Sequence, residues 1–278
     1  MPAIGVTMSR YSQLFSHLEQ KGQRAFVPFV NLGDPDADTS AAILRTLVEA
    51  GADALELGFP FSDPVADGPT IQAAGIRALA AGFKMATGWK LIEGVRAAAP
   101  DVPIGLLIYA NLVVQSQGGI AGFYRQAFRS GVDSVLIGDL PLKEVEPYRA
   151  AAIAAGVETV LMAPPNAGPE CLAEVARQSS GYVYVVSRSG VTGADVSLQD
   201  ANRERIAALK ALSSPPCLIG FGISQPDQVR QALDWGADGA ISGSAVVKII
   251  ERNLSDKPAM LHELGVFVRS MKEATRAC

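Results

Sequence analysis

The sequence predicts an α/β protein: one (β/α)8 TIM barrel domain spanning residues 1–278, with extra helices at the N-terminus and in the loop after the second strand. Two observations predict this fold. Short apolar runs alternate with helical stretches along the whole chain, and a unit of Gly, then Ala or Val, then Asp recurs between a helix and the next run. Glycine after a helix supplies a left-handed cap, and the following apolar run is too short for a helix. Eight alternating strand–helix units without a linker between them favour a closed barrel over a doubly wound sheet.

The apolar runs predict strands near residues 25–31, 53–58, 103–109, 133–138, 158–163, 182–187, 217–221 and 238–242. The Gly-x-Asp unit precedes the second, fourth and eighth strands, and a related turn at Gly156 precedes the fifth. Extra helices are predicted at about 9–21 and between 60 and 80. In such barrels the active site forms at the C-terminal ends of the strands, so the residues that end each run are the candidates.

Composition narrows the class of protein. The 24 basic and 28 acidic residues give a net charge of −4 without a basic stripe, which disfavours a nucleic-acid partner. Three widely spaced cysteines without a CxxC pair argue against a disulfide framework and a zinc site. The longest apolar run, about 104–114, is shorter than the ~18 residues of a membrane span. We therefore expect a soluble, cytoplasmic protein without membrane contact.

The residues that are missing restrict the chemistry further. His17 and His262 are the only histidines and lie in the end segments, so a histidine triad or a histidine metal centre is not expected. Lys143 lies just past the fourth strand, and the other lysines fall in helical or terminal stretches, so no Schiff-base lysine stands out. Carboxylate acid/base catalysis without a metal remains.

Glu56 is the main candidate acid, because it stands inside an apolar run that reads as a buried strand. A carboxyl group there must be paired, hydrogen-bonded or neutral, which raises its pKa. Asp67 lies in the loop behind it, nearer water, and is expected to stay ionised. The alternatives are a purely structural Glu56 and an Asp67 that only orders its Asp-Gly turn. Asp63 suits a turn or a partner contact and stays outside the catalytic set.

Glycine-rich joints end the seventh and eighth strands, at 220–224 and 242–245, and a third glycine turn follows the sixth at 190–193. Glycine lets backbone N–H groups approach an anion, and a helix beginning at Ser244 adds its positive end. Phosphate sites of barrels commonly lie in loops seven and eight. The alternative is that these glycines only make tight turns.

With these motifs in order, the chain closely resembles the tryptophan synthase alpha subunit family over essentially its whole length. The segments that carry the resemblance are 26–35, 55–68, 109–112, 163–166, 184–193, 220–224 and 241–245. The resemblance implies a lyase of tryptophan biosynthesis that splits indole-3-glycerol phosphate by a retro-aldol reaction into indole and glyceraldehyde 3-phosphate. It implies that Glu56 protonates indole C3 and helps to remove the proton of the glycerol hydroxyl, while Asp67 holds the indole N–H.

The resemblance also implies which residues bind the substrate. From their spacing alone, the apolar residues of this set would be interpreted as ordinary core residues. Residues that match an indole pocket are Phe29, Leu107, Tyr109, Leu136, Met162, Tyr184 and Phe221. Residues that match a phosphate grip are Gly193, Gly222, Gly243 and Ser244, and Thr192 matches a loop residue that meets the strand-two aspartate on closure. Three residues depart from the family pattern, namely Asn31, Gly138 and Met162. We expect these departures to affect the selectivity of the indole pocket rather than the type of reaction.

A partner is implied as well. The resemblance predicts a beta subunit, a pyridoxal-phosphate enzyme that receives indole in an α2β2 heterotetramer, with allosteric coupling through loop ordering. The chain itself is expected to carry no cofactor. Exposed apolar side chains in Phe59-Pro60-Phe61 fit an interface patch, or else they pack under the loop. The rival functions are a sugar-phosphate isomerase or epimerase and a catalytically silent regulatory subunit.

Overall fold

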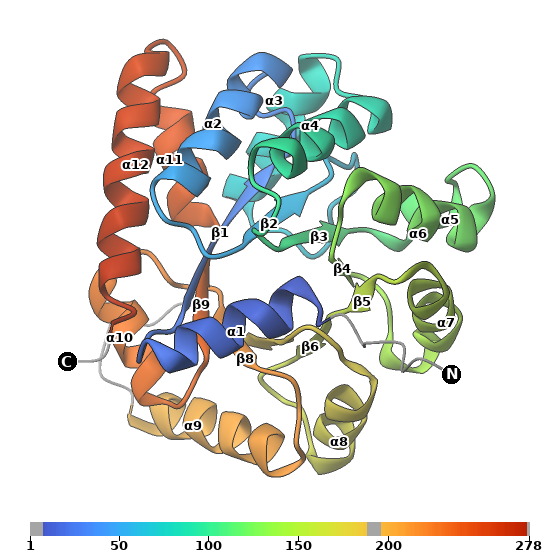
Figure 1. Ribbon diagram of the computed structural model, residues 1–278, viewed down its shortest axis with the longest axis vertical. Helices are drawn as coiled ribbons and strands as arrows, with labels where there is room; N and C mark the ends of the chain where they lie inside the picture. The colour runs from blue at the N-terminus through green and yellow to red at the C-terminus, as the bar shows by residue number, and fades with distance from the viewer. Residues whose placement is uncertain (1–7, 188–195, 277–278) are drawn as a thin grey trace, which may run out of the picture.

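The computed structural model describes residues 8–187 and 196–276, and Figure 1 shows helices surrounding a central sheet. The strands are β1 (Ala25–Asn31), β2 (Leu55–Gly58), β3 (Ile104–Ile108), β4 (Ser134–Ile137), β5 (Glu158–Thr159), β6 (Leu161–Ala163), β7 (Val183–Val186), β8 (Cys217–Gly220) and β9 (Gly239–Ser242). The helices are α1 (Arg10–Gln20), α2 (Ala37–Glu49), α3 (Pro69–Ala80), α4 (Met85–Ala98), α5 (Ala110–Val114), α6 (Gly119–Ser130), the short 3₁₀ helix η1 (Leu142–Glu144), α7 (Glu146–Ala155), α8 (Pro169–Gln178), α9 (Val196–Ala211), α10 (Pro226–Asp234), α11 (Ser244–Arg252) and α12 (Lys257–Glu273).

The sheet closes on itself through its fifth barrel strand. All strand pairs are parallel. The strand order is β5-β4-β3-β2-β1-β9-β8-β7-β6, and the strands at its two ends, β5 and β6, are separated in the sequence by Val160 alone. The Val160 amide continues the pairing, since it donates a 3.0 Å hydrogen bond to the carbonyl of Val135 in β4. β5 and β6 are therefore two halves of one strand, and the (β/α)8 barrel predicted from the sequence is confirmed.

The predicted elements agree with the structure in the main, and the largest differences are the following. The fifth strand is divided, because its first half pairs with β4 and its second half with β7. The helix expected between 60 and 80 occupies only its second half, as α3, because Gly68 caps the helix and Pro69 begins it. The long C-terminal helix α12 was not predicted, and it packs on α2 and α11 at the side of the barrel (Figure 1).

The aspartates of the recurring Gly-x-Asp unit tie adjacent strands together. The glycines take the predicted left-handed conformation, with φ of +98° at Gly51, +93° at Gly131 and +92° at Gly236. Each following carboxylate accepts a hydrogen bond from the first residues of the neighbouring strand and also pairs with a cation. The contacts are Asp53 with the Phe26 amide and Lys272, Asp133 with the Ile104 amide and Arg96, and Asp238 with the Cys217 amide and Lys210.

The N-terminal end of the barrel is closed by α1. Tyr11 is 2% exposed, its hydroxyl lies 3.0 Å from Oγ of Ser134 at the start of β4, and its ring packs against Tyr182. Arg10 anchors the same helix through a 2.8 Å ion pair with Asp133. Side chains of α1 therefore fill this end of the barrel. No helix among the described residues is both long and apolar enough to cross a membrane.

Candidate active site

Glu56 points into the barrel because side chains alternate along β2. Leu55 and Leu57 pack outward among the helices, whereas Glu56 faces the interior and is 1% exposed. The Tyr182 hydroxyl donates a 2.7 Å hydrogen bond to Oε1 of Glu56. Burial raises the pKa of Glu56 to about 7, and the hydrogen bond from Tyr182 opposes that rise. The carboxyl group is therefore able both to give and to take a proton near neutral pH.

Asp67 lies in the loop between β2 and α3, at the edge of the same space. The loop is held from both sides: the Ala66 amide donates to the Tyr109 hydroxyl at 3.1 Å, and the Gln72 side-chain amide donates to the Asp67 carbonyl at 2.8 Å. Burial raises the pKa of Asp67, and a hydrogen bond from the Tyr109 hydroxyl opposes the rise. The two carboxyl groups of the site thus have different surroundings, as expected.

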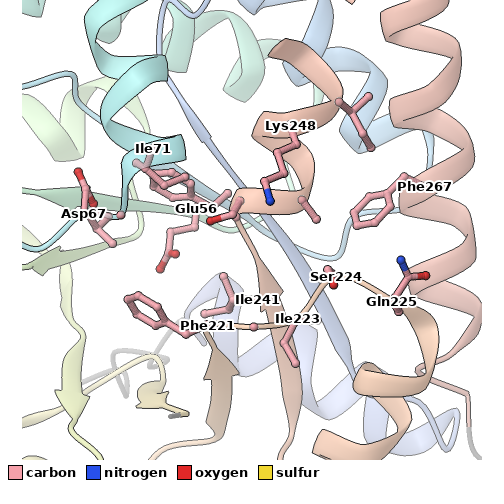
Figure 2. Close-up of a pocket in the computed structure, with 18 of the residues that line it drawn as sticks. Glu56, Asp67, Ile71, Phe221, Ile223, Ser224, Gln225, Ile241, Lys248 and Phe267 are labelled. Carbon is pink, nitrogen blue, oxygen red and sulfur yellow. The ribbon is translucent and has the colours of Figure 1, made fainter. Parts of the chain in front are cut away.

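A cavity of about 710 Å³ opens at the C-terminal end of the barrel beside both carboxyl groups (Figure 2). Glu56, Asp67 and Phe221 lie toward one side of it, and Ser224, Gln225 and Lys248 lie toward the other. Of the predicted site residues, the cavity wall contains Phe29, Glu56, Asp67, Leu107, Tyr184, Phe221, Gly222, Gly243 and Ser244.

The far side of the cavity is built from loops seven and eight. Gly222 has a φ of +79°, and α11 begins at Ser244 as predicted, directly after Gly243. The start of α11 therefore directs unpaired backbone N–H groups and the positive end of the helix toward the cavity. Ser187 steadies loop seven, because its hydroxyl donates to the Phe221 carbonyl at 2.6 Å. This wall has the features of an anion site.

The remaining predicted residues lie elsewhere. Tyr109 borders a narrow pocket next to Asp67 and stacks on Phe61, with ring centroids 5.2 Å apart. Leu136 is 2% exposed within the barrel interior, and Met162 lines a separate cavity of about 220 Å³. These three do not line the 710 Å³ cavity. Thr192 and Gly193 lie outside the described residues.

The position of Tyr184 depends on a glycine in the neighbouring strand. Tyr184 is 6% exposed, and its ring meets Phe221 edge to face at a centroid distance of 6.1 Å. A Cβ atom at Gly220 would overlap the phenol ring and hydroxyl of Tyr184. Gly220 therefore provides the space that lets this tyrosine cover the floor of the cavity.

Comparison with known proteins shows the family of this chain. Residues 15–276 match the family described as tryptophan synthase alpha chain. The chain is 54% identical to the tryptophan synthase alpha chain of Photobacterium profundum, over 97% of its own length and 99% of that protein's, and 52% identical to that of Proteus mirabilis, over 96% and 99%.

The chain belongs to the tryptophan synthase alpha chain family.

Solved structures of tryptophan synthase have the same fold. The alpha subunit from Legionella pneumophila superposes with a TM-score of 0.87 at 29% identity, covering 97% of this chain and 99% of that one. A tryptophan synthase structure from Mycobacterium tuberculosis gives a TM-score of 0.87 at 29% identity, covering 98% and 100%. As a member of this alpha chain family, the protein is a tryptophan synthase component with a beta-subunit partner.

Two residues of this tryptophan synthase alpha chain site were not predicted. Tyr182 was missed, although it alternates with Tyr184 along one strand, and that spacing of two places both rings inside the barrel. Lys248 was also missed. The sequence feature that could have identified Lys248 is its position four residues after Ser244, which puts both side chains on one face of α11.

One expectation about the partner surface was wrong. Phe59 is 3% exposed and packs on Phe83 and Trp89, and Pro60 is buried too, so these residues do not form an exposed patch. The alternative, in which these side chains are packed rather than exposed, agrees better with the structure.

Asp63 is exposed and accepts a 2.5 Å hydrogen bond from its neighbour Ser62, as a turn residue would.

Proposed function

We propose that this chain cleaves indole-3-glycerol phosphate to indole and glyceraldehyde 3-phosphate, as the carbon–carbon lyase component of tryptophan synthase (EC 4.2.1.20). The observation that carries the proposal is the arrangement of one cavity: a buried carboxyl group with a pKa of about 7 lies between apolar walls, opposite an anion-binding helix start. A ligand with an aromatic end and a phosphate end suits such a cavity.

Cleavage requires a proton at C3 of the indole ring. The protonated carboxyl group of Glu56 donates it, and the ring becomes a cation that can accept the electron pair of the bond between C3 and the side chain. That bond then breaks, its electron pair restores the aromatic ring, and the side-chain hydroxyl loses its proton to the Glu56 carboxylate as the aldehyde forms. Glu56 is thereby returned to its protonated state, and all atoms and electrons balance.

Asp67 is proposed to act on the nitrogen of the same ring. Positive charge reaches this nitrogen when C3 is protonated, and an ionised carboxylate within hydrogen-bond distance stabilises it. The surroundings of Asp67 suit this role, since it is only partly exposed and its loop is anchored to Tyr109. The apolar walls formed by Phe29, Leu107 and Tyr184 exclude water from the ring.

The chain's own residues supply all of this chemistry, so we propose that the chain has no cofactor. Among the described residues, no three His, Cys, Asp or Glu side chains form a group that could hold a metal ion. Pyridoxal phosphate is assigned to the beta subunit, which would take the indole in an α2β2 assembly in the cytoplasm. The loop containing Thr192 and Gly193 is proposed to close over the phosphate and meet the strand-two loop.

The test is indole release from indole-3-glycerol phosphate by the purified chain, alone and with a beta subunit. We expect slow cleavage that increases when the beta subunit is added. Glu56→Gln keeps the shape but removes the transferable proton, and kcat should fall by about 100-fold or more. The matched control is Glu49→Gln, the same change on the exposed face of α2. Turnover of a sugar phosphate with none of the indole substrate would instead select an isomerase or epimerase.

A further inference from the structure

Lys248 is a charged residue of the cavity to which the reaction described above gives no role. It lies on α11, one turn after Ser244, and it lines the 710 Å³ cavity together with Gly222, Gly243 and Ser244. Figure 2 shows its side chain descending from α11 into the cavity, with the ammonium nitrogen at the lower end. Its charge therefore lies on the anion-binding side of the cavity.

The neighbouring cations are already paired, whereas Lys248 has no partner in the part of the chain that the structure describes. Arg252, the next residue on the same face of α11, forms a 2.6 Å ion pair with Glu263 and also lines the cavity. Arg77, from the adjacent α3, is held by two 2.8 Å hydrogen bonds to Asp34. Among the described residues, Lys248 forms no hydrogen bond or ion pair with any other side chain. An ammonium group that faces a cavity without a carboxylate is available for a ligand.

The charges of the cavity are separated along its length. Glu56 and Asp67 lie toward the strand-two side, and Lys248 lies toward loops seven and eight (Figure 2). A ligand with an anionic group at one end binds favourably in one direction only, since the reverse direction would bring its anion to the carboxyl groups. The positive end of α11 and the Lys248 charge act on the same end of the ligand.

We propose that Lys248 is a specificity-determining residue of this site, whose ammonium group pairs with the phosphate dianion of the substrate and sets the direction of binding. The inference rests on the proposed function for the substrate but extends the anion site beyond its backbone N–H groups. Backbone groups and a hydroxyl bind phosphate without adding a full charge, whereas a lysine adds one and so favours a doubly charged ester over a neutral alcohol.

The experiment compares Lys248→Met, Lys248→Arg and a matched control. Lys90→Met removes one exposed lysine from α4, a helix that contributes no residue to the cavity. For each variant, titration calorimetry measures the Kd of glycerol 3-phosphate at low and high salt, and steady-state assays measure KM and kcat for indole-3-glycerol phosphate.

We expect Lys248→Met to weaken glycerol 3-phosphate binding by about tenfold, which corresponds to about 1.4 kcal/mol, and to reduce its dependence on salt. The loss should fall on KM rather than on kcat, because the phosphate contact is the same before and during bond cleavage. Lys248→Arg should recover most of the affinity, and Lys90→Met should match the wild-type Kd.

An unchanged Kd in Lys248→Met, or an equal loss in Lys90→Met, would overturn the inference. A loss confined to kcat would overturn it as well. The calorimetric arm separates this inference from the proposed function. If glycerol 3-phosphate binding depends on Lys248 while wild-type protein cleaves no indole-3-glycerol phosphate, the reaction is wrong but the phosphate-ester contact stands.

Discussion

The Tyr182 hydroxyl donates a 2.7 Å hydrogen bond to Oε1 of Glu56 across the barrel interior, from the residue before β7 to the middle of β2. Tyr182 is itself 2% exposed and packs on Tyr11 of α1. The helix that closes the N-terminal end of the barrel therefore supports the tyrosine that orients the Glu56 carboxyl group. Both the direction of the Glu56 carboxyl group and its pKa depend on this contact.

Tyr182→Phe tests the contact. The hydrogen bond lowers the pKa of Glu56, so its loss raises that pKa above about 7. Because Glu56 is proposed to act in its protonated form, the high-pH limb of the profile of kcat/KM should move to higher pH. The maximal rate should fall by up to about tenfold, since the carboxyl group loses its orientation. Tyr148→Phe, on the outer side of the barrel, is the control, and an unmoved limb would contradict the assignment.

Burial of Glu56 also predicts how stability depends on pH. Its pKa is raised from 4.5 to about 7 in the folded protein, so the folded state holds this proton more tightly than the unfolded state does. This stabilisation is complete below pH 4.5 and is lost as the pH rises through about 7, a change of about 3 kcal/mol.

Glu56→Gln removes this titration. The stability of the variant relative to wild type should therefore increase by about 3 kcal/mol between pH 4.5 and pH 8. Urea unfolding at several pH values measures the difference, and the other raised carboxyl groups cancel because both proteins contain them. A difference that stays constant over this range would mean that Glu56 is not buried as described.

Gly220→Ala should damage the site through Tyr184. The added methyl group overlaps the phenol of Tyr184, so the ring or the strand must move, at a cost of about 1–3 kcal/mol of folding free energy. Tyr184→Leu should relieve the overlap, so the double variant should be more stable than the sum of the two single changes predicts. Thermal unfolding of all four proteins measures this coupling, and strict additivity would argue against the contact.

Asp133 should affect stability without affecting catalysis. Its carboxylate binds the Ile104 amide and pairs with Arg10 and Arg96 at the N-terminal end of the barrel, away from the cavity. Asp133→Asn should lower the free energy of unfolding by about 3 kcal/mol, because two partly buried arginines lose their counter-charge. The value of kcat should match wild type. Asp101→Asn, at an exposed position of the adjacent loop, serves as the control.

Two parts of the candidate site were predicted from local sequence patterns. Glu56 was predicted because a carboxyl group in an apolar strand is costly unless it has a purpose, and the anion site was predicted because glycines precede a helix start at Ser244. Tyr109, Leu136 and Met162 were assigned to the indole pocket by resemblance. Their positions at the edge of the large cavity or outside it depend on side-chain directions that strand spacing does not give.

The sequence by itself determined the order of strands and helices, the glycine joints between them and the strand that holds Glu56, because these depend on local periodicity and backbone freedom. Only the tertiary structure decided which distant residues meet: Tyr182 with Glu56, Tyr184 with Gly220, and Lys248 with the anion side of the cavity. The physical reason is barrel closure. Closure brings β2, β7 and the start of α11 together around the interior of the barrel. The pattern of a short segment carries no information about the distances between such elements.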